Sequence, residues 1–168
     1  MARAARNTGS HSKGKTAEGK DSLRLWLRLL ACSTMIEREV RARLRNKFNA
    51  TLPRFDMMAA LDRANGGLSM GELSRRLMVS NGNVTGVADR LAREGLVKRW
   101  SPPADRRSSR LALTARGRKE FSSMAKAHQG WIEEMMAGLN TTERDALIAL
   151  LARVKLSIGS KDGGRDAA

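Results

Sequence analysis

A length of 168 residues suits one domain of ordinary size. The formal charge of +15 favours a polyanionic partner such as nucleic acid. No apolar run approaches the roughly 18 to 20 residues of a membrane span and no secretory signal opens the chain, so we expect a cytoplasmic protein without membrane contact. One cysteine and two histidines exclude an internal disulfide and a Cys/His zinc cluster, and we expect no structural metal and no cofactor.

The N-terminal segment changes character at Ser22. Residues 1–21 are small, polar and basic without periodicity, which predicts a flexible arm. From Ser22 to near Phe48, apolar residues recur at steps of three and four, which predicts a helix of about 26 residues, roughly 39 Å long. These residues are Leu23, Trp26, Leu27, Leu30, Ala31, Met35 or Ile36, Val40 and Leu44. Because such a helix is too long to pack along one small lobe, part of it must contact another surface.

Two shorter helices follow, each with a recognisable start. Pro53 suits the first turn of a helix, and the sequence Asn65-Gly66-Gly67 ends it. The apolar positions of this helix are Phe55, Met58, Ala59 and Leu61. Leu68 then forms a short extended link. Ser69 and Glu72 predict a capping box at the start of the next helix, because they are three residues apart.

A further helix that begins at Ser80 has one apolar and one polar side. Its inward stripe consists of Val84, Val87, Ala88 and Leu91. The polar residues that point away from this stripe or lie along its borders are Asn81, Asn83, Thr85 and Arg90. Amides, hydroxyls and a guanidinium on one exposed helix face are what a helix in the major groove offers to base edges and phosphates.

Gly95 ends this helix, and a β-hairpin is predicted next. Residues 96–100 form one strand, in which Leu96, Lys98 and Trp100 share a face, and residues 110–113 form its partner. The connection is polar and marked by prolines, which is typical of a wing. Its charged residues are Arg106, Arg107 and Arg110, opposed only by Asp105. Between residues 71 and 120, twelve Lys and Arg face five acidic residues, so the positive charge is concentrated around this region.

Two long helices complete the chain. Thr114 caps a helix that runs to about Gly138, with a near-heptad stripe of Phe121, Met124, His128, Trp131, Met135 and Leu139. Residues 140–143 cap the last helix, which is amphipathic through Leu147, Leu150, Leu151, Val154 and Ile158. Residues 159–168 form a polar tail. The expected fold class is mainly α with a small β-wing, a winged helix-turn-helix within a single domain over residues 22–158.

The central segment resembles the MarR-type transcription regulators. The resemblance rests on the spacing of Asn83-Val84, Gly86, Leu91, Gly95-Leu96-Val97, Asp105-Arg106-Arg107, Thr114 and Gly117, and only Ala92 departs from the pattern. It implies that residues 22–52 and 114–158 are dimerisation helices around a winged module at residues 53–113. A homodimer would present two recognition helices about one DNA turn apart, to a roughly palindromic site.

The resemblance also implies which residues contact double-stranded DNA. Arg107 enters the minor groove, Asp105 orients it, and Arg106 binds phosphate. Arg75, Arg76 and Arg90 contact phosphates, which fixes the register without reading sequence. At least two residues of the helix start contact bases or phosphates. The expected DNA-binding set is Arg75, Ser80, Asn81, Asn83, Thr85, Arg90, Asp105, Arg106 and Arg107.

A ligand pocket is implied between the dimer helices and the winged module. Its candidate lining is Trp26, Arg28, Met35, Met58, Met124, His128 and Trp131, although core or dimer packing explains the same apolar residues. Family ligands are commonly aromatic acids or, in some members, their coenzyme A thioesters. Arg24, Arg28 or the basic end of the first helix would supply cations for a thioester's phosphates. The expected function is therefore a repressor that a small aromatic effector releases from its operator.

Other functions compete with this interpretation. A sequence-tolerant architectural protein would bind DNA through charge and bending alone. An oxidant sensor would use Cys32, but the family branch that senses oxidants supports its thiolate with tyrosines, and this chain has none. We therefore expect Cys32 to be a small buried hydrophobe. An enzyme is not expected, because no motif pairs either histidine with Cys32 or a serine.

Overall fold

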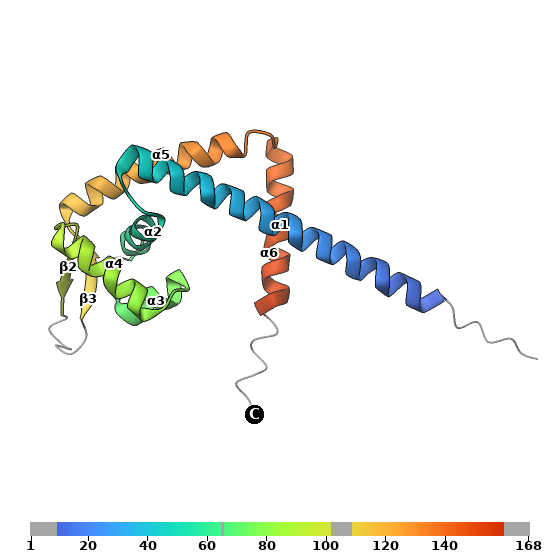
Figure 1. Ribbon diagram of the computed structural model, residues 1–168, viewed down its shortest axis with the longest axis horizontal. Coiled ribbons are helices and arrows are strands. Elements are labelled where there is room, and N and C mark those ends of the chain that lie inside the picture. Colours follow the sequence, from blue (N-terminus) through green and yellow to red (C-terminus); the bar gives the residue numbers. More distant parts are fainter. Residues whose placement is uncertain (1–9, 65, 102–108, 160–168) are drawn as a thin grey trace, which may run out of the picture. The chain divides into compact units, whose positions relative to one another are not determined.

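The computed structural model describes residues 10–64, 66–101 and 109–159 (Figure 1). They form two compact units that divide after Ala125. The predicted fold class is confirmed, because six helices and three short strands are found in these residues. The elements are α1 (Ser10–Phe48), α2 (Leu52–Asp62), β1 (Leu68–Ser69), α3 (Met70–Leu77), α4 (Asn81–Arg93), β2 (Val97–Trp100), β3 (Arg110–Leu113), α5 (Ala115–Met135) and α6 (Thr141–Gly159).

The first helix is longer than the sequence predicts. α1 has 39 residues, which corresponds to about 58 Å. The prediction of a flexible arm over residues 1–21 is therefore wrong for residues 10–21, which are helical, whereas residues 1–9 lie outside the described part. Extending a helix that has already formed costs little, and the Lys, Ala and Glu residues of this segment are good helix formers.

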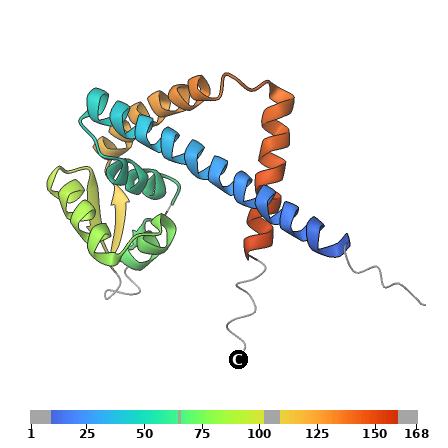
Figure 2. The same cartoon turned by 45° about the vertical axis from the view of Figure 1, so that its right-hand side comes forward.

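The N-terminal half of α1 extends away from the other elements of the first unit (Figures 1 and 2). Between residues 23 and 35, α1 exposes the large apolar side chains Leu23, Leu25, Trp26, Leu27, Leu30 and Met35. The C-terminal quarter of the helix enters the core instead, where Val40 and Leu44 are buried. The expectation that part of this helix must find another surface therefore agrees with its exposure.

The core of the first unit lies between α1, α2, α3, α4, the sheet and the start of α5. Phe55 and Phe121 place their ring centroids 5.6 Å apart, which joins α2 to α5. Met57 is buried although the predicted stripe omitted it. The other buried apolar residues are Val40, Leu44, Ala50, Met58, Leu61, Leu68, Leu73, Val84, Ala88, Leu91, Leu96, Val97, Leu111, Leu113 and Met124.

The sheet has the strand order β1-β3-β2, and all its pairs are antiparallel. Val97 pairs with Leu113 and Trp100 with Arg110, so the predicted hairpin is confirmed. The burial of the side chains along the first strand of the hairpin differs slightly from the prediction. Leu96 and Val97 are both buried, because Leu96 precedes the strand and packs at the junction with α4. Lys98 is exposed.

The junction between α4 and α5 is close-packed at backbone level. The Thr114 hydroxyl accepts a hydrogen bond of 3.0 Å from the Gly117 amide, which confirms the predicted cap. A Cβ atom added to Gly117 would lie 2.0 Å from the Leu96 carbonyl oxygen. The chain therefore needs glycine at this point, where α5 passes over the end of the preceding helix.

The second unit holds the end of α5 and all of α6. Asn140 and Glu143 form a reciprocal cap, with side-chain to backbone distances of 2.9 and 3.0 Å, as their spacing predicts. α5 ends at Met135, slightly before the predicted Gly138. No residue of α6 is buried. Its exposed apolar side chains are Leu147, Ile148, Leu150, Leu151, Val154, Leu156 and Ile158.

Candidate nucleic-acid interface

The turn between α3 and α4 fixes where α4 begins. The predicted capping box at the start of α3 is present, since the Ser69 hydroxyl accepts from the Glu72 amide at 3.2 Å and Glu72 Oε2 accepts from the Ser69 amide at 2.7 Å. Met78 ends α3 in the left-handed conformation, with φ of 53°. Ser74 then holds the turn through a hydrogen bond from its hydroxyl to the Val79 carbonyl at 2.6 Å.

We expect Ser69→Ala to lower the free energy of unfolding by about 1 kcal/mol, because one helix-start amide loses its partner.

The pKa of Glu72 lies below its ordinary value of 4.5, chiefly because of the Ser69 backbone hydrogen bond, then the Ser69 side chain. A lowered carboxyl pKa stabilises the fold above pH 4.5 and loses that effect as the pH falls through the folded value. The stability difference between wild type and Glu72→Gln should therefore shrink in acid during urea titrations. A constant difference from pH 7 to pH 3 would contradict this.

α4 has the two predicted faces. Val84, Ala88 and Leu91 are buried and Val87 is half-buried. The predicted polar residues Ser80, Asn81, Asn83, Thr85 and Arg90 are all exposed. Ser80 precedes the helix as its cap residue, but its side chain makes no capping hydrogen bond. The helix thus presents a continuous polar surface of the kind that enters a major groove.

The arginines around this surface differ in exposure and in whether they have an acidic partner. Arg75 and Arg76 are exposed in the last turn of α3. Arg90 is 71% exposed and approaches Glu94 at 3.5 Å, a contact weak enough for the guanidinium to change partners. Arg99 pairs with Asp89 and so connects β2 to α4. Arg75, Arg76 and Arg90 are therefore available to phosphates.

One arginine that the sequence placed in the wing has a different role. Arg110 donates a hydrogen bond of 2.9 Å to the Gly67 carbonyl and lies 3.5 Å from Glu72. It therefore ties β3 to the start of α3, and the prediction that only Asp105 opposes its charge is wrong, because Glu72 also does. Asp105, Arg106 and Arg107 lie outside the described residues, so their roles stay predictions.

Arg54 is a residue that supports α4 and that the sequence analysis missed. Its side chain is 17% exposed, and it pairs with Glu94 and, at 2.6 Å, with Glu120. Arg54 thereby connects α2 to the end of α4 and the start of α5. The sequence could have indicated this role. Arg54 lies four residues before Met58, on the buried side of α2, and a cation at such a position requires acidic partners.

The residues of the predicted ligand pocket do not share one environment. Met58 and Met124 are fully buried in the core of the first unit, so they are not exposed to a ligand in this chain. Trp26, Arg28 and Met35 are exposed on α1. His128 and Trp131 are half-buried on α5, in the second unit, and burial lowers the pKa of His128. The pocket itself stays a prediction.

Cys32 is exposed on α1. The expectation that it is a small buried hydrophobe is therefore wrong for this chain, because no other described element of the first unit covers the middle of the helix. The described part of the chain contains no group of three or more metal-ligating side chains. Within the same part, no helix combines the length and apolar character that crossing a membrane requires.

The class of protein is a winged helix-turn-helix protein. It is defined by the buried stripe and exposed polar face of α4, by the turn from α3 that precedes this helix, and by the hairpin that follows it. The sequence profile of the MarR family matches residues 50–109. A MarR family transcriptional regulator from Silicibacter pomeroyi is 30% identical, with a TM-score of 0.71 over 84% of this chain and 97% of that one. This chain belongs to the MarR family.

Two other relatives show the range of similarity. The transcriptional activatory protein BadR of Rhodopseudomonas palustris is 33% identical over 61% of this chain and 59% of its own length. The chain spans 57 to 59% of the curated relatives it matches first. A cysteine-to-serine mutant of Escherichia coli MarR, solved with operator DNA, is 24% identical and has the same fold, with a TM-score of 0.69 over 80% of this chain and 95% of that one. Relatives named as transcriptional regulators agree with the expectation that the chain is not an enzyme.

Proposed function

We propose that this chain is a DNA-binding transcription regulator that inserts α4 into the major groove of an operator. The observation that carries the proposal is the exposed surface of α4, where Asn81, Asn83 and Thr85 are exposed while Val84, Ala88 and Leu91 of the same helix are buried. Asparagine can make a bidentate contact with adenine, and a threonine methyl can contact thymine. α4 would therefore read base edges through its first two turns.

Phosphate contacts would fix the helix in this position. Arg75 and Arg76 at the end of α3, and Arg90 on α4, are exposed cations beside the polar face. The wing would supply a second groove contact through Arg107, whose side chain Asp105 would orient. Arg106 would bind a phosphate. Contacts of this kind set affinity and salt dependence more than sequence preference.

The proposal includes a homodimer. Both α1 and α6 expose rows of large apolar side chains, and such surfaces in a protein of this size are typical of subunit interfaces. Two-fold symmetry would place two copies of α4 on a palindromic operator. The regulator would act in the cytoplasm, most simply as a repressor, because a bound dimer occludes the DNA.

Regulation by a small aromatic acid or its coenzyme A thioester completes the proposal. An effector can release the operator only if it binds the non-binding geometry of the dimer more tightly than the binding one. BadR is named as an activatory protein, so a reporter gene placed behind the operator should decide whether this chain activates or represses transcription. Displacement of labelled operator by a panel of aromatic acids and their thioesters tests the effector class.

Base reading is tested with Asn83→Ala. We expect the affinity for the operator to fall by about 1 to 3 kcal/mol while binding to random duplex stays unchanged. Binding is measured by fluorescence anisotropy on both duplexes after footprinting has located the operator. If the protein coats any duplex uniformly and Asn83→Ala weakens neither, an architectural protein replaces the proposed regulator.

Phosphate contact is tested with Arg90→Gln. This variant should weaken binding to operator and random duplex alike, and should reduce the slope of log affinity against log salt by about one. Arg38→Gln is the matched control, because Arg38 is an exposed arginine of α1 distant in sequence from the proposed contacts. Equal slopes for the two variants would remove Arg90 from the interface.

A further inference from the structure

The turn between α3 and α4 contains a methionine whose side chain the fold does not require. Met78 follows the last residue of α3 and has φ of 53° and ψ of 40°, in the left-handed region. Its side chain is 92% exposed, the highest value among the exposed large apolar residues that the structure describes. Because so little of it is buried, Met78 gains almost nothing from the hydrophobic effect within this chain.

The backbone conformation at this position also disfavours methionine. In the left-handed region the Cβ atom of an L-residue crowds a carbonyl oxygen, and glycine avoids this contact. The other described residues with positive φ are Asn49, Gly67 and Gly95. Glycine suits the conformation, and so does asparagine, whose short polar side chain can form local hydrogen bonds. Among the described residues of this group, Met78 alone has a long apolar side chain.

The hydrogen bonds that hold the turn do not use the methionine side chain. The amides of Met78 and Val79 both donate to the Ser74 carbonyl, the second at 3.2 Å. The Ser74 hydroxyl donates to the Val79 carbonyl at 2.6 Å. These bonds involve the backbone and Ser74 only, so glycine at position 78 would form the same turn at a lower conformational cost. The reason for methionine therefore lies outside the described chain.

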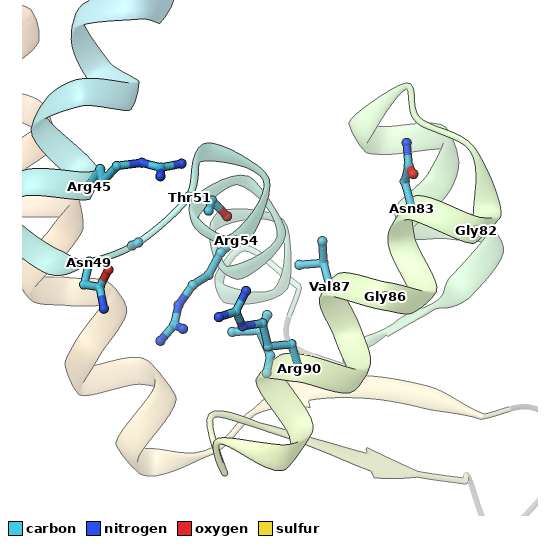
Figure 3. A pocket seen from close by; sticks show the side chains of 11 residues that line it. Arg45, Asn49, Thr51, Arg54, Gly82, Asn83, Gly86, Val87 and Arg90 are labelled. Carbon is cyan, nitrogen blue, oxygen red and sulfur yellow. The ribbon is translucent and has the colours of Figure 1, made fainter.

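Met78 lies close to the part of α4 that is proposed to enter the major groove. Three peptide units separate it from Asn81, the first residue of α4, so their Cα atoms are at most about 11 Å apart. Figure 3 shows Asn83 on the first turn of the helix, at the end that the chain enters from α3. The major groove is about 12 Å wide. A duplex that receives the first turn of α4 therefore comes within reach of the Met78 side chain.

The charges around Met78 favour nucleic acid as the molecule that covers it. Arg75 and Arg76 are exposed and precede it by three and two residues. Between Glu72 and Asp89 the sequence contains these two arginines and no acidic residue. A surface of this charge attracts a polyanion. The exposed methionine is thus an apolar group within a surface that is otherwise suited to DNA.

We propose that Met78 determines operator specificity by contacting the C5-methyl group of a thymine at the edge of each half-site. The inference rests on the proposed function, since α4 must occupy the major groove. Among the base edges in that groove, the thymine methyl is the group that apolar side chains recognise. Methionine is unbranched, flexible and polarisable, so it adapts to an irregular apolar surface. It would add a base contact from outside the recognition helix.

Replacement of thymine by deoxyuridine removes this methyl group alone and therefore tests the contact. Each thymine of the footprinted operator is replaced in turn, and fluorescence anisotropy measures the affinity of the wild type and of Met78→Gly. For the wild type we expect roughly fourfold weaker binding wherever a contacted methyl is lost. At one thymine of each half-site, this loss should disappear in Met78→Gly. Identical deoxyuridine effects in the two proteins at every thymine would overturn the proposal.

Two further variants separate the apolar contact from the change in the backbone. Met78→Leu keeps an apolar side chain and should retain the deoxyuridine effect. Asn49→Gly places glycine at the left-handed residue that follows α1, and it should show the wild-type pattern at every thymine. Loss of the effect in either variant would contradict a methyl contact made by Met78.

Urea unfolding shows whether the side chain serves the fold instead. Met78→Gly should have a midpoint at or above that of the wild type, although it binds the operator less tightly, because glycine relieves the left-handed strain. A lower midpoint would assign Met78 to the fold and overturn the inference. If the wild type prefers no operator over random duplex, the proposed regulator itself fails. If it prefers its operator and the deoxyuridine pattern is independent of residue 78, only the methyl contact fails.

Discussion

Gly117→Ala is expected to destabilise the first unit by several kcal/mol. An alanine Cβ at this position would lie 2.0 Å from the Leu96 carbonyl oxygen and 2.9 Å from its carbon. Both atoms belong to the backbone, so no side chain can rotate away. The same oxygen accepts the Thr114 amide at 3.0 Å, and a shift that relieves the clash would break this bond. Overpacking of this kind typically costs 1 to 3 kcal/mol, and a backbone clash with a lost hydrogen bond should lie at about 3 kcal/mol or more.

The expected result is a lower midpoint in urea unfolding, because the loss is a large fraction of the roughly 5 to 15 kcal/mol by which small domains are stable. Gly130→Ala is the control in the same helix, since a Cβ there meets nothing within 4 Å. That variant should gain roughly 0.5 to 1 kcal/mol. If Gly117→Ala unfolded at or above the wild-type midpoint, the close approach of α5 to Leu96 would be wrong.

Sequence alone predicts those features whose causes are local. The buried stripe of α4 follows from spacing, because residues three and four apart share a helix face. The capping boxes Ser69 to Glu72 and Asn140 to Glu143 each join residues three apart, so no knowledge of the fold is needed to place them. The polar face proposed for DNA could be predicted for the same reason.

The long-range hydrogen bonds and ion pairs of arginines around the site could not be predicted in this way. Arg110 contacts Gly67, 43 residues earlier, and Arg54 contacts Glu120, 66 residues later. Each arginine looks like a solvated surface charge until the fold brings its partner close. Arg45, Arg54 and Arg90, which line a cavity beside α4, likewise come from three helices, and only the packing of α2 against both α1 and α4 brings them together.

In the proposed dimer a second copy would cover part of α1 and α6, and spacing in one sequence does not reveal which residues it would cover. The predicted stripe on α6 names five apolar residues, yet Ile148 and Leu156 are also exposed, at 65% and 73%. Cys32 is exposed for the related reason that the middle of α1 lacks a covering element among the described residues of the first unit. A helix that is apolar on more than one side is expected to be enclosed in the assembled protein.

The double substitution Leu147→Glu and Leu151→Glu is expected to prevent the proposed dimer and to lower operator affinity at least a hundredfold. The two leucines lie four residues apart on α6 and are 39% and 42% exposed, so they share a face that one copy leaves uncovered. Two carboxylates on that face would have to be buried without partners in a dimer, which costs several kcal/mol. A monomer holds one half-site only and loses the effective concentration that the second copy provides, a factor of roughly 100 to 10,000.

Sedimentation equilibrium gives the mass of the variant, circular dichroism its helix content, and anisotropy its affinity for an operator and for a single half-site. The control is Thr142→Glu, in the first turn of the same helix, where an added carboxylate is compatible with the helix dipole. It should remain a dimer with wild-type affinity. A double variant that stays dimeric and binds the operator normally would show that this face of α6 is not the interface. Because no side chain of α4 is altered, the half-site affinity of the monomer should equal that of one wild-type subunit, which separates loss of assembly from loss of base contact.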